Sequence, residues 1–208
     1  MKRPMYIARQ AAKPSGMLGR LIAWIMARET AELNEHAVRL LALDPSDSVL
    51  EVGFGHGHTV ERLAAAVPRG RVTGIDHSEA MTQRATRRIR RAAPSVCVDL
   101  RTADCASLPF ASHQFDKALS VHTIYFWIDP LACLREVHRV LRPGARFVLG
   151  FTRRGSSRSA GFPAAVYTFY DDEQVRALLT DAGFESVELT RIGDAALAVA
   201  IASKVRAA

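Results

Sequence analysis

Short apolar runs alternate with helical patterns from about residue 47 onward. The strand-like runs cover residues 48–52, 71–75, 96–102, 115–121 and 146–151. Helical patterns lie between them, near residues 59–66, 79–92 and 130–141. The triplet Arg142, Pro143 and Gly144 is expected to end the last of these helices and turn the chain into the next strand. Because helical crossovers connect parallel strands, this order predicts a doubly wound α/β sheet with helices on both faces.

The pattern changes near the C-terminus. Residues 171–182 predict a helix with Val175, Leu178 and Leu179 on one face, ended by Gly183. Two strand-like runs follow, residues 184–191 and 195–203, and the few residues between them are too short for a crossover. They therefore predict an antiparallel hairpin. The fold expected is a Rossmann-like seven-stranded sheet, mostly parallel with a terminal antiparallel hairpin.

The first 45 residues carry helical spacing of a different kind. The apolar positions that recur at this spacing are Leu18, Leu21, Ile22, Ile25 and Met26, then Leu33, Ala37, Leu40 and Leu41. We expect one or two helices here, which would form a cap or lid (residues 1–45) before one globular domain (residues 46–208). The length of 208 residues agrees with a single domain.

Composition and charge narrow the class of protein. Hydrophobic residues make up 49% and charged residues 24% of the chain, as in folded soluble proteins. The net charge of +7 would suit an anionic partner, but its densest run, residues 84–91, is interpreted as a solvated helix face. Cys97, Cys105 and Cys133 fit neither a disulfide framework nor a zinc pattern, so we expect reduced thiols and a cytoplasmic location. The apolar run 18–26 is interrupted by Arg20 and is too short to span a bilayer.

A glycine-rich turn follows the first predicted strand. Gly53, Gly55 and Gly57 stand at alternate positions between that strand and a helix, where the backbone can approach a ligand closely. The dinucleotide fingerprint requires a glycine at position 58, and this chain has His58. Glu51 would also repel a pyrophosphate, whereas its carboxylate favours the sulfonium and ammonium groups of S-adenosylmethionine. The alternative is an exposed glutamate at a strand end.

Polar residues also end the next strands. Asp76 can accept hydrogen bonds from a ribose diol, although it could instead cap the following helix, as could Ser78. Asp104 follows the third strand, where its carboxylate can accept a hydrogen bond from an adenine amino group. The end of the fourth strand should lie beside the methionine part of the cofactor, with His122 and Tyr125 near the transferable methyl group.

Together these segments resemble the class I S-adenosylmethionine-dependent methyltransferases of the ubiquinone and menaquinone biosynthesis group. The resemblance covers about residues 47–151 and includes the helix and turn at 134–144. It implies S-adenosylmethionine as cofactor and S-adenosylhomocysteine as product. The cofactor contacts that we expect are Glu51, Gly53, Phe54, Gly55, Gly57, Asp76, His77, Asp104, Cys105, Ser120 and Val121.

The acceptor is less defined by the sequence. His122 is the first candidate for a catalytic base and Tyr125 the second, with a hydrogen-bonded structural histidine as the alternative for His122. Many relatives carry a histidine pair where this chain has Tyr125 and Phe126. Trp24, Tyr125, Phe126 and Tyr167 are expected to line an aromatic or apolar acceptor site, although at least half of such rings are expected in the core.

Several alternatives stay open. We expect a small-molecule acceptor and no metal. A macromolecular acceptor (RNA or protein) is the alternative, but no Pro-Pro-Tyr type motif and no cysteine follows the fourth strand, so nucleic acid is not the expected partner. Another alternative is a peripheral membrane contact with a lipid or quinone acceptor, which the basic amphipathic segment 13–28 would allow. A non-catalytic cofactor-binding protein and a nicotinamide oxidoreductase are weaker alternatives, and the protein could be a monomer or a homodimer.

Overall fold

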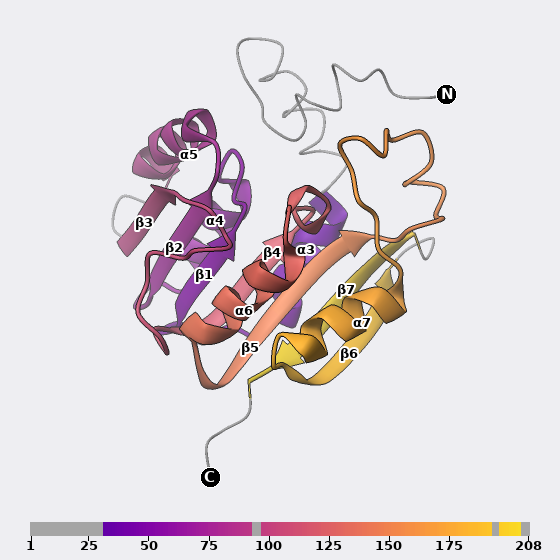
Figure 1. The fold of residues 1–208 in the computed structure, drawn as a ribbon. Helices are drawn as coiled ribbons and strands as arrows, with labels where there is room; N and C mark the ends of the chain where they lie inside the picture. Colours follow the sequence, from indigo (N-terminus) through magenta and orange to yellow (C-terminus); the bar gives the residue numbers. More distant parts are fainter. Residues whose placement is uncertain (1–30, 93–96, 193–195, 205–208) are drawn as a thin grey trace.

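The computed structural model describes residues 31–92, 97–192 and 196–204. Its helices are α3 (Ala31–Leu40), α4 (His58–Ala66), α5 (Glu79–Ala92), the 3-10 turn η1 (Ile124–Phe126), α6 (Pro130–Val140) and α7 (Asp172–Asp181). Its strands are β1 (Ser48–Val52), β2 (Arg71–Asp76), β3 (Cys97–Thr102), β4 (Phe115–Val121), β5 (Leu141–Thr152), β6 (Glu185–Ile192) and β7 (Leu197–Ser203). Figure 1 shows the strands as one twisted sheet with helices on both faces.

The sheet has the predicted topology. Its strand order is β3-β2-β1-β4-β5-β7-β6. The pairs among β3, β2, β1, β4 and β5 are parallel, whereas β7 runs antiparallel to both β5 and β6. The chain moves outward from β1 to β3 and then returns to β4 on the other side of β1. This reversal places a crevice at the carboxyl ends of β1 and β4, where open α/β sheets bind ligands.

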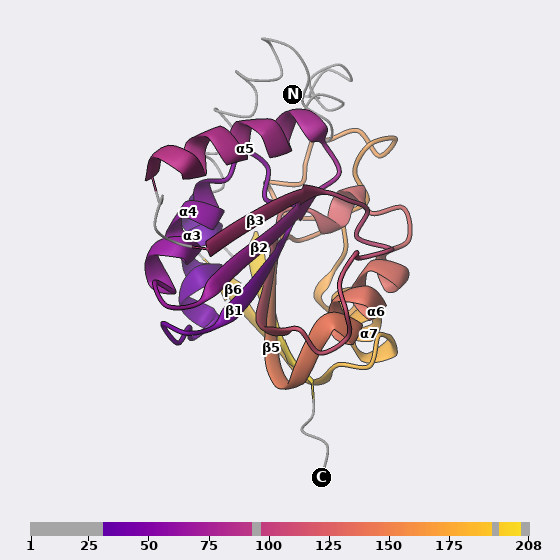
Figure 2. The ribbon, with the colours of Figure 1, turned by 90° about the vertical axis from the view of Figure 1, so that its left-hand side faces the viewer.

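Helices cover both faces of the sheet, as Figure 2 shows from the edge, and a hydrophobic cluster lies on each face. Leu134 of α6 and Val175 of α7 belong to the cluster on one face, together with Leu50 of β1. Leu33 of α3 and Val49 of β1 belong to the cluster on the other face. Successive residues of β1 therefore point to opposite sides, as strand geometry requires, and both sides are buried.

The structure corrects one boundary. β5 begins at Leu141, directly after α6, so Arg142, Pro143 and Gly144 lie within the strand and do not form the predicted turn. Leu141 pairs with Phe115, and the register then shifts before Lys117 pairs with Arg146. A left-handed φ of 81° at Gly144 accommodates the extra residues.

The second helical pattern of the N-terminal segment is confirmed as α3, which buries Leu33, Ala37 and Leu41 against the sheet. The first pattern, residues 18–26, lies outside the described residues. Within the described ranges, no helix is long and apolar enough to cross a membrane.

Candidate functional site

A cleft of about 760 Å³ opens at the carboxyl ends of the central strands. Its walls are residues 51–56 after β1, 75–77 at the end of β2, 102–106 after β3, and 121–123 and 126–129 after β4. Four of the predicted cofactor elements therefore meet in one place, because parallel strands present their carboxyl ends on the same edge.

The glycine turn folds back over the end of β2. Gly53 has φ of 81° and its N–H donates to the carbonyl of Ile75 over 2.7 Å. A Cβ at this position would lie 2.2 Å from Cγ2 of Thr123, so only glycine lets the turn after β1 approach the segment after β4. Gly57 begins α4 with φ of 82° against Ala85, and it does not line the cleft.

The carboxylate of Asp76 holds two backbone segments. One oxygen accepts the N–H of Gly55 over 2.8 Å, and the other accepts the N–H of Ser78 over 2.9 Å. The side chain is buried, and this burial raises its pKa against the opposing effect of the two hydrogen bonds. His77, also at the cleft wall, has its Nδ1 3.7 Å from the Asp76 carboxylate. Asp76 thus shapes the cleft wall, with lone pairs left for a ligand.

Glu51 is the most unusual acidic group in the cleft. It is 5% exposed, and its Oε2 has no hydrogen-bond partner among the described residues. Burial, followed by repulsion from Asp76, raises the pKa of Glu51 to about 8. A buried carboxyl group without a partner is costly, so its side chain favours a cationic group that enters the cleft.

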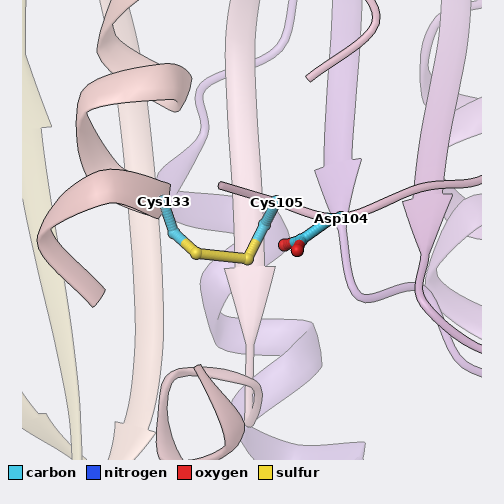
Figure 3. Close-up of side chains that lie close together, drawn as sticks. All are labelled: Asp104, Cys105 and Cys133. Carbon is cyan, nitrogen blue, oxygen red and sulfur yellow. A yellow bond between two sulfur atoms is a disulfide. The ribbon is translucent and has the colours of Figure 1, made fainter. Parts of the chain in front are cut away.

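The loop after β3 contributes Asp104 and Cys105. Asp104 is exposed at the cleft and its Oδ1 accepts the N–H of Ala106 over 2.9 Å. Cys105 forms a disulfide with Cys133 at the start of α6, as drawn in Figure 3. The expectation of three reduced thiols was therefore wrong: 28 residues separate these cysteines, and only the packing of α6 beside this loop brings them together. Cys97 is free and exposed.

The Asp104 carboxylate and the two sulfur atoms lie within 4.8 Å of one another, which is a spacing that three metal ligands could have. With the sulfur atoms bonded to each other, they are not available as thiolate ligands.

The end of β4 brings His122 to the cleft in a left-handed conformation, with φ of 61°. Its Nδ1 lies 3.0 Å from the hydroxyl oxygen of Tyr125, and its Nε2 is buried without a hydrogen-bond partner among the described residues. Burial, and secondarily Arg158, lowers the pKa of His122 to about 4. The imidazole is therefore neutral at pH 7.

Ser120, two residues before His122, does not line the cleft, whereas Val121 does. The Ser120 hydroxyl donates to the carbonyl of Val52 over 2.9 Å and also hydrogen bonds to the Thr123 hydroxyl. It joins β4 to β1 from within the core.

Tyr125, predicted as a catalytic or acceptor-binding residue, has a buried side chain that does not line the cleft. Its hydroxyl accepts the backbone N–H of Thr152 in β5, and its ring lies 5.0 Å from that of Phe169. Burial raises the pKa of Tyr125 above its usual value.

Tyr167 is also buried away from the cleft, stacked on Phe169 with ring centroids 5.7 Å apart. The rings of Tyr167 and Phe126 lie 4.8 Å apart, and Phe126 does line the cleft. Trp24 lies outside the described residues. The rings of Tyr125 and Tyr167 therefore belong to the core, whereas Phe126 lies at the cleft.

Some cleft residues were not singled out from the sequence. They are Asn34, His56, Thr59, Met81, Thr123, Ile128 and Cys133. Asn34 comes from α3, which shows that the N-terminal helical segment reaches the site. For the segment 126–129, the sequence does carry a local signal: Asp129 before Pro130 is typical of a helix start. In the structure the Asp129 carboxylate accepts the N–H of Ala132 and so fixes the end of this segment at the cleft.

Known proteins match this chain in sequence and fold. Residues 50–149 match the family described as the Methyltransferase domain. The uncharacterized methyltransferase YdaC of Bacillus subtilis (strain 168) is 29% identical over 169 residues, which are 81% of this chain and 88% of that protein. The ubiquinone/menaquinone biosynthesis C-methyltransferase UbiE of Geotalea daltonii is 30% identical over 114 residues, which are 54% of this chain and 48% of that enzyme. The crystal structure of an S-adenosylmethionine-dependent methyltransferase from Aquifex aeolicus aligns with a TM-score of 0.75 at 22% identity, over 98% of this chain and 100% of the other.

Proposed function

We propose that this chain is a class I S-adenosylmethionine-dependent methyltransferase and that it transfers a methyl group to a small apolar or aromatic acceptor. When bound, S-adenosylmethionine would supply an electrophilic methyl group on a sulfonium. The chain would supply the cleft that holds the cofactor and acceptor in line.

The observation that carries the cofactor assignment is the buried Glu51 carboxyl, whose Oε2 has no hydrogen-bond partner in the described part of the chain. Once ionised, this carboxylate would repel a pyrophosphate, whereas the ammonium or sulfonium of S-adenosylmethionine would stabilise its charge. Asp76 would accept hydrogen bonds from the ribose, and Asp104 at the far wall would meet the adenine. This order of acidic groups along the cleft follows the order of β1, β2 and β3.

The acceptor end of the cleft, as we define it, is formed by His122, Phe126, Trp127 and Ile128. Ile128 is fully exposed, and the rings of Phe126 and Trp127 pack partly against the core. An apolar or aromatic molecule would bury its surface against these side chains, which gains about 25 cal/mol per Å². Methyl transfer is an in-line displacement, so such positioning can supply much of the rate.

The hydrogen bonds around His122 suggest its role. The Tyr125 oxygen accepts the N–H of Thr152, which leaves the hydroxyl hydrogen of Tyr125 to donate to Nδ1 of His122. The neutral imidazole then carries its proton on Nε2. We therefore propose that His122 donates a hydrogen bond to the acceptor and does not act as a general base.

Calorimetric titration with S-adenosylmethionine, S-adenosylhomocysteine and NAD tests the cofactor. We expect micromolar binding of the first two, no binding of NAD, and loss of binding in Asp76→Ala. Asp99→Ala is the matched control, because Asp99 is an acidic residue of β3 that pairs with Arg101 away from the cleft. Binding of NAD alone, or of none of the three, would refute the proposal.

Transfer of a labelled methyl group tests the acceptor class. We expect label in a panel of aromatic hydroxyls, amines and quinols. Label found only in RNA, in protein or in liposomes would instead support a macromolecular or membrane-bound acceptor.

A further inference from the structure

The Cys105–Cys133 disulfide joins two walls of the cleft that have different roles in the proposed function, on which this inference rests. Cys105 directly follows Asp104 in the loop after β3. Cys133 lies in the first turn of α6, just after the segment 126–129 at the acceptor end. Figure 3 shows the bridge crossing from the helix to the loop, with the Asp104 carboxylate beside it.

The bridge joins the middle of this loop to α6. The loop is fixed at one end by the N–H of Ala103, which donates to the carbonyl of Asp76, and at the other by the N–H of Leu108, which donates to Glu136. Between these ends, the hydrogen bonds of Asp104 within the described part of the chain stay in the loop, with Ala106 and Ser107. The disulfide adds a covalent tie from this middle section to α6, beside the packing of Cys105 against the core.

Both cysteines line the cleft, and Cys133 is only 2% exposed. A small thiol would therefore reach the bond through the space that the cofactor is proposed to fill. Disulfides in an intracellular setting are usually transient and redox-sensing, which agrees with a bond placed at a ligand site.

We propose that Cys105 and Cys133 form a reversible thiol–disulfide modification site that sets the affinity for the cofactor. A dithiol reductant attacks one sulfur as a thiolate and forms a mixed disulfide, and its second thiol then displaces the protein thiol. Two electrons and two protons pass from the dithiol to the two cysteines. A low-molecular-weight disulfide, of the glutathione disulfide type, reverses the exchange.

The oxidised protein should bind the cofactor more tightly. The bridge holds Asp104 and its neighbours in place before binding, whereas the reduced loop must be ordered during binding. Coupling of this kind typically changes affinity between 5- and 150-fold, and we expect about tenfold here. The coupling is reciprocal, so a bound cofactor should also shift the equilibrium of the bridge toward the disulfide.

The first measurement is a thiol count in denaturant after oxidation in air, since oxidised glutathione would also convert the exposed Cys97 into a mixed disulfide. We expect one reactive thiol, Cys97, and three after treatment with dithiothreitol. Three reactive thiols in the oxidised sample would overturn the proposal, whatever the protein binds.

The second measurement is the Kd for S-adenosylhomocysteine in both redox states. We expect about tenfold weaker binding after reduction and recovery on reoxidation. Cys133→Ser, and independently Cys105→Ser at a half-buried position, should show the weaker value in both states, whereas Cys97→Ser should respond as the wild type does. Equal affinity in both states of the wild type would overturn this inference alone, whereas absence of binding in both states would remove the proposed function with it.

Discussion

Proton release should accompany cofactor binding, because Glu51 is protonated in the free protein. Burial and the neighbouring Asp76 raise the pKa of Glu51 to about 8, so about nine-tenths of the protein carries the proton at pH 7. Relative to its usual value of 4.5, ionisation in the empty cleft costs about 5 kcal/mol more than in water. A cationic ligand stabilises the carboxylate and so lowers its pKa, and the proton leaves on binding.

The number of protons released and the pH dependence of the affinity follow from this pKa. About 0.9 proton should be released for each cofactor bound at pH 7, and the affinity should rise about tenfold between pH 6 and pH 7. In this window an α-amino group, with a pKa of about 7.7 to 8.0, is mostly charged. His56 and His122, whose pKa burial lowers to about 4, are already neutral and contribute no proton.

The assay is calorimetric titration with S-adenosylmethionine at pH 7 in phosphate and in Tris, since the change in enthalpy with buffer ionisation enthalpy gives the number of protons released. Glu51→Gln has no proton to lose, so its titration should show release near zero and an affinity that varies little between pH 6 and pH 7. The reasoning is refuted if the wild type binds the cofactor with the same proton release as Glu51→Gln.

Three further predictions concern the frame of the site, and urea unfolding checks each. Gly53→Ala should lose more stability than Gly155→Ala, because both residues have positive φ but only the first would place a Cβ against Thr123, at 2.2 Å; equal losses would contradict this. Tyr125→Phe removes the acceptor of the buried Thr152 N–H and should cost about 1–3 kcal/mol, and an unchanged midpoint would count against it. Reduction of the disulfide should lower the free energy of unfolding by about 3–4 kcal/mol, because the bridge closes a loop of 28 residues. The control Cys97→Ser should lose the same amount when it is reduced.

Most of the fold could be predicted because its elements carry strong local patterns. The bounds of β1, β4 and α5 match the predicted ranges 48–52, 115–121 and 79–92. The start of β5 could not be predicted in this way, because it depends on contacts with a distant segment. Leu141 pairs with Phe115, and the Arg142 guanidinium forms an ion pair with Asp116 of β4, 26 residues away.

The positions of the residues proposed to hold the cofactor were also predictable, because they are placed by the backbone. Glu51, Asp76 and Asp104 lie at or just after the carboxyl ends of neighbouring parallel strands, and the topology alone brings such positions to one edge. The left-handed conformation of Gly53 follows from the same turn.

The acceptor side was less predictable, because its side chains are placed by long-range packing. Tyr125 is adjacent to residues that line the cleft, yet its hydroxyl meets the backbone of Thr152 in β5. Cys105 and Cys133 have no recognisable spacing, and only the position of α6 beside the loop after β3 joins them. Local sequence could show that aromatic residues gather here but not which of them line the cleft.

The placement of Tyr125 also limits the acceptor. In the proposed arrangement the Tyr125 hydroxyl donates to Nδ1 of His122, which would then present its Nε2 hydrogen to the acceptor. Burial lowers the pKa of His122 to about 4, so the imidazole is a weak base. The Asp129 carboxylate, at the same end, accepts the N–H of Ala132. We therefore expect acceptors that are already nucleophilic at neutral pH, such as amines or ionised phenols. Among phenols of similar shape, kcat/KM should rise with pH along the ionisation of each phenol; one profile shared by all of them, set by an enzyme group, would show that the chain does supply a base.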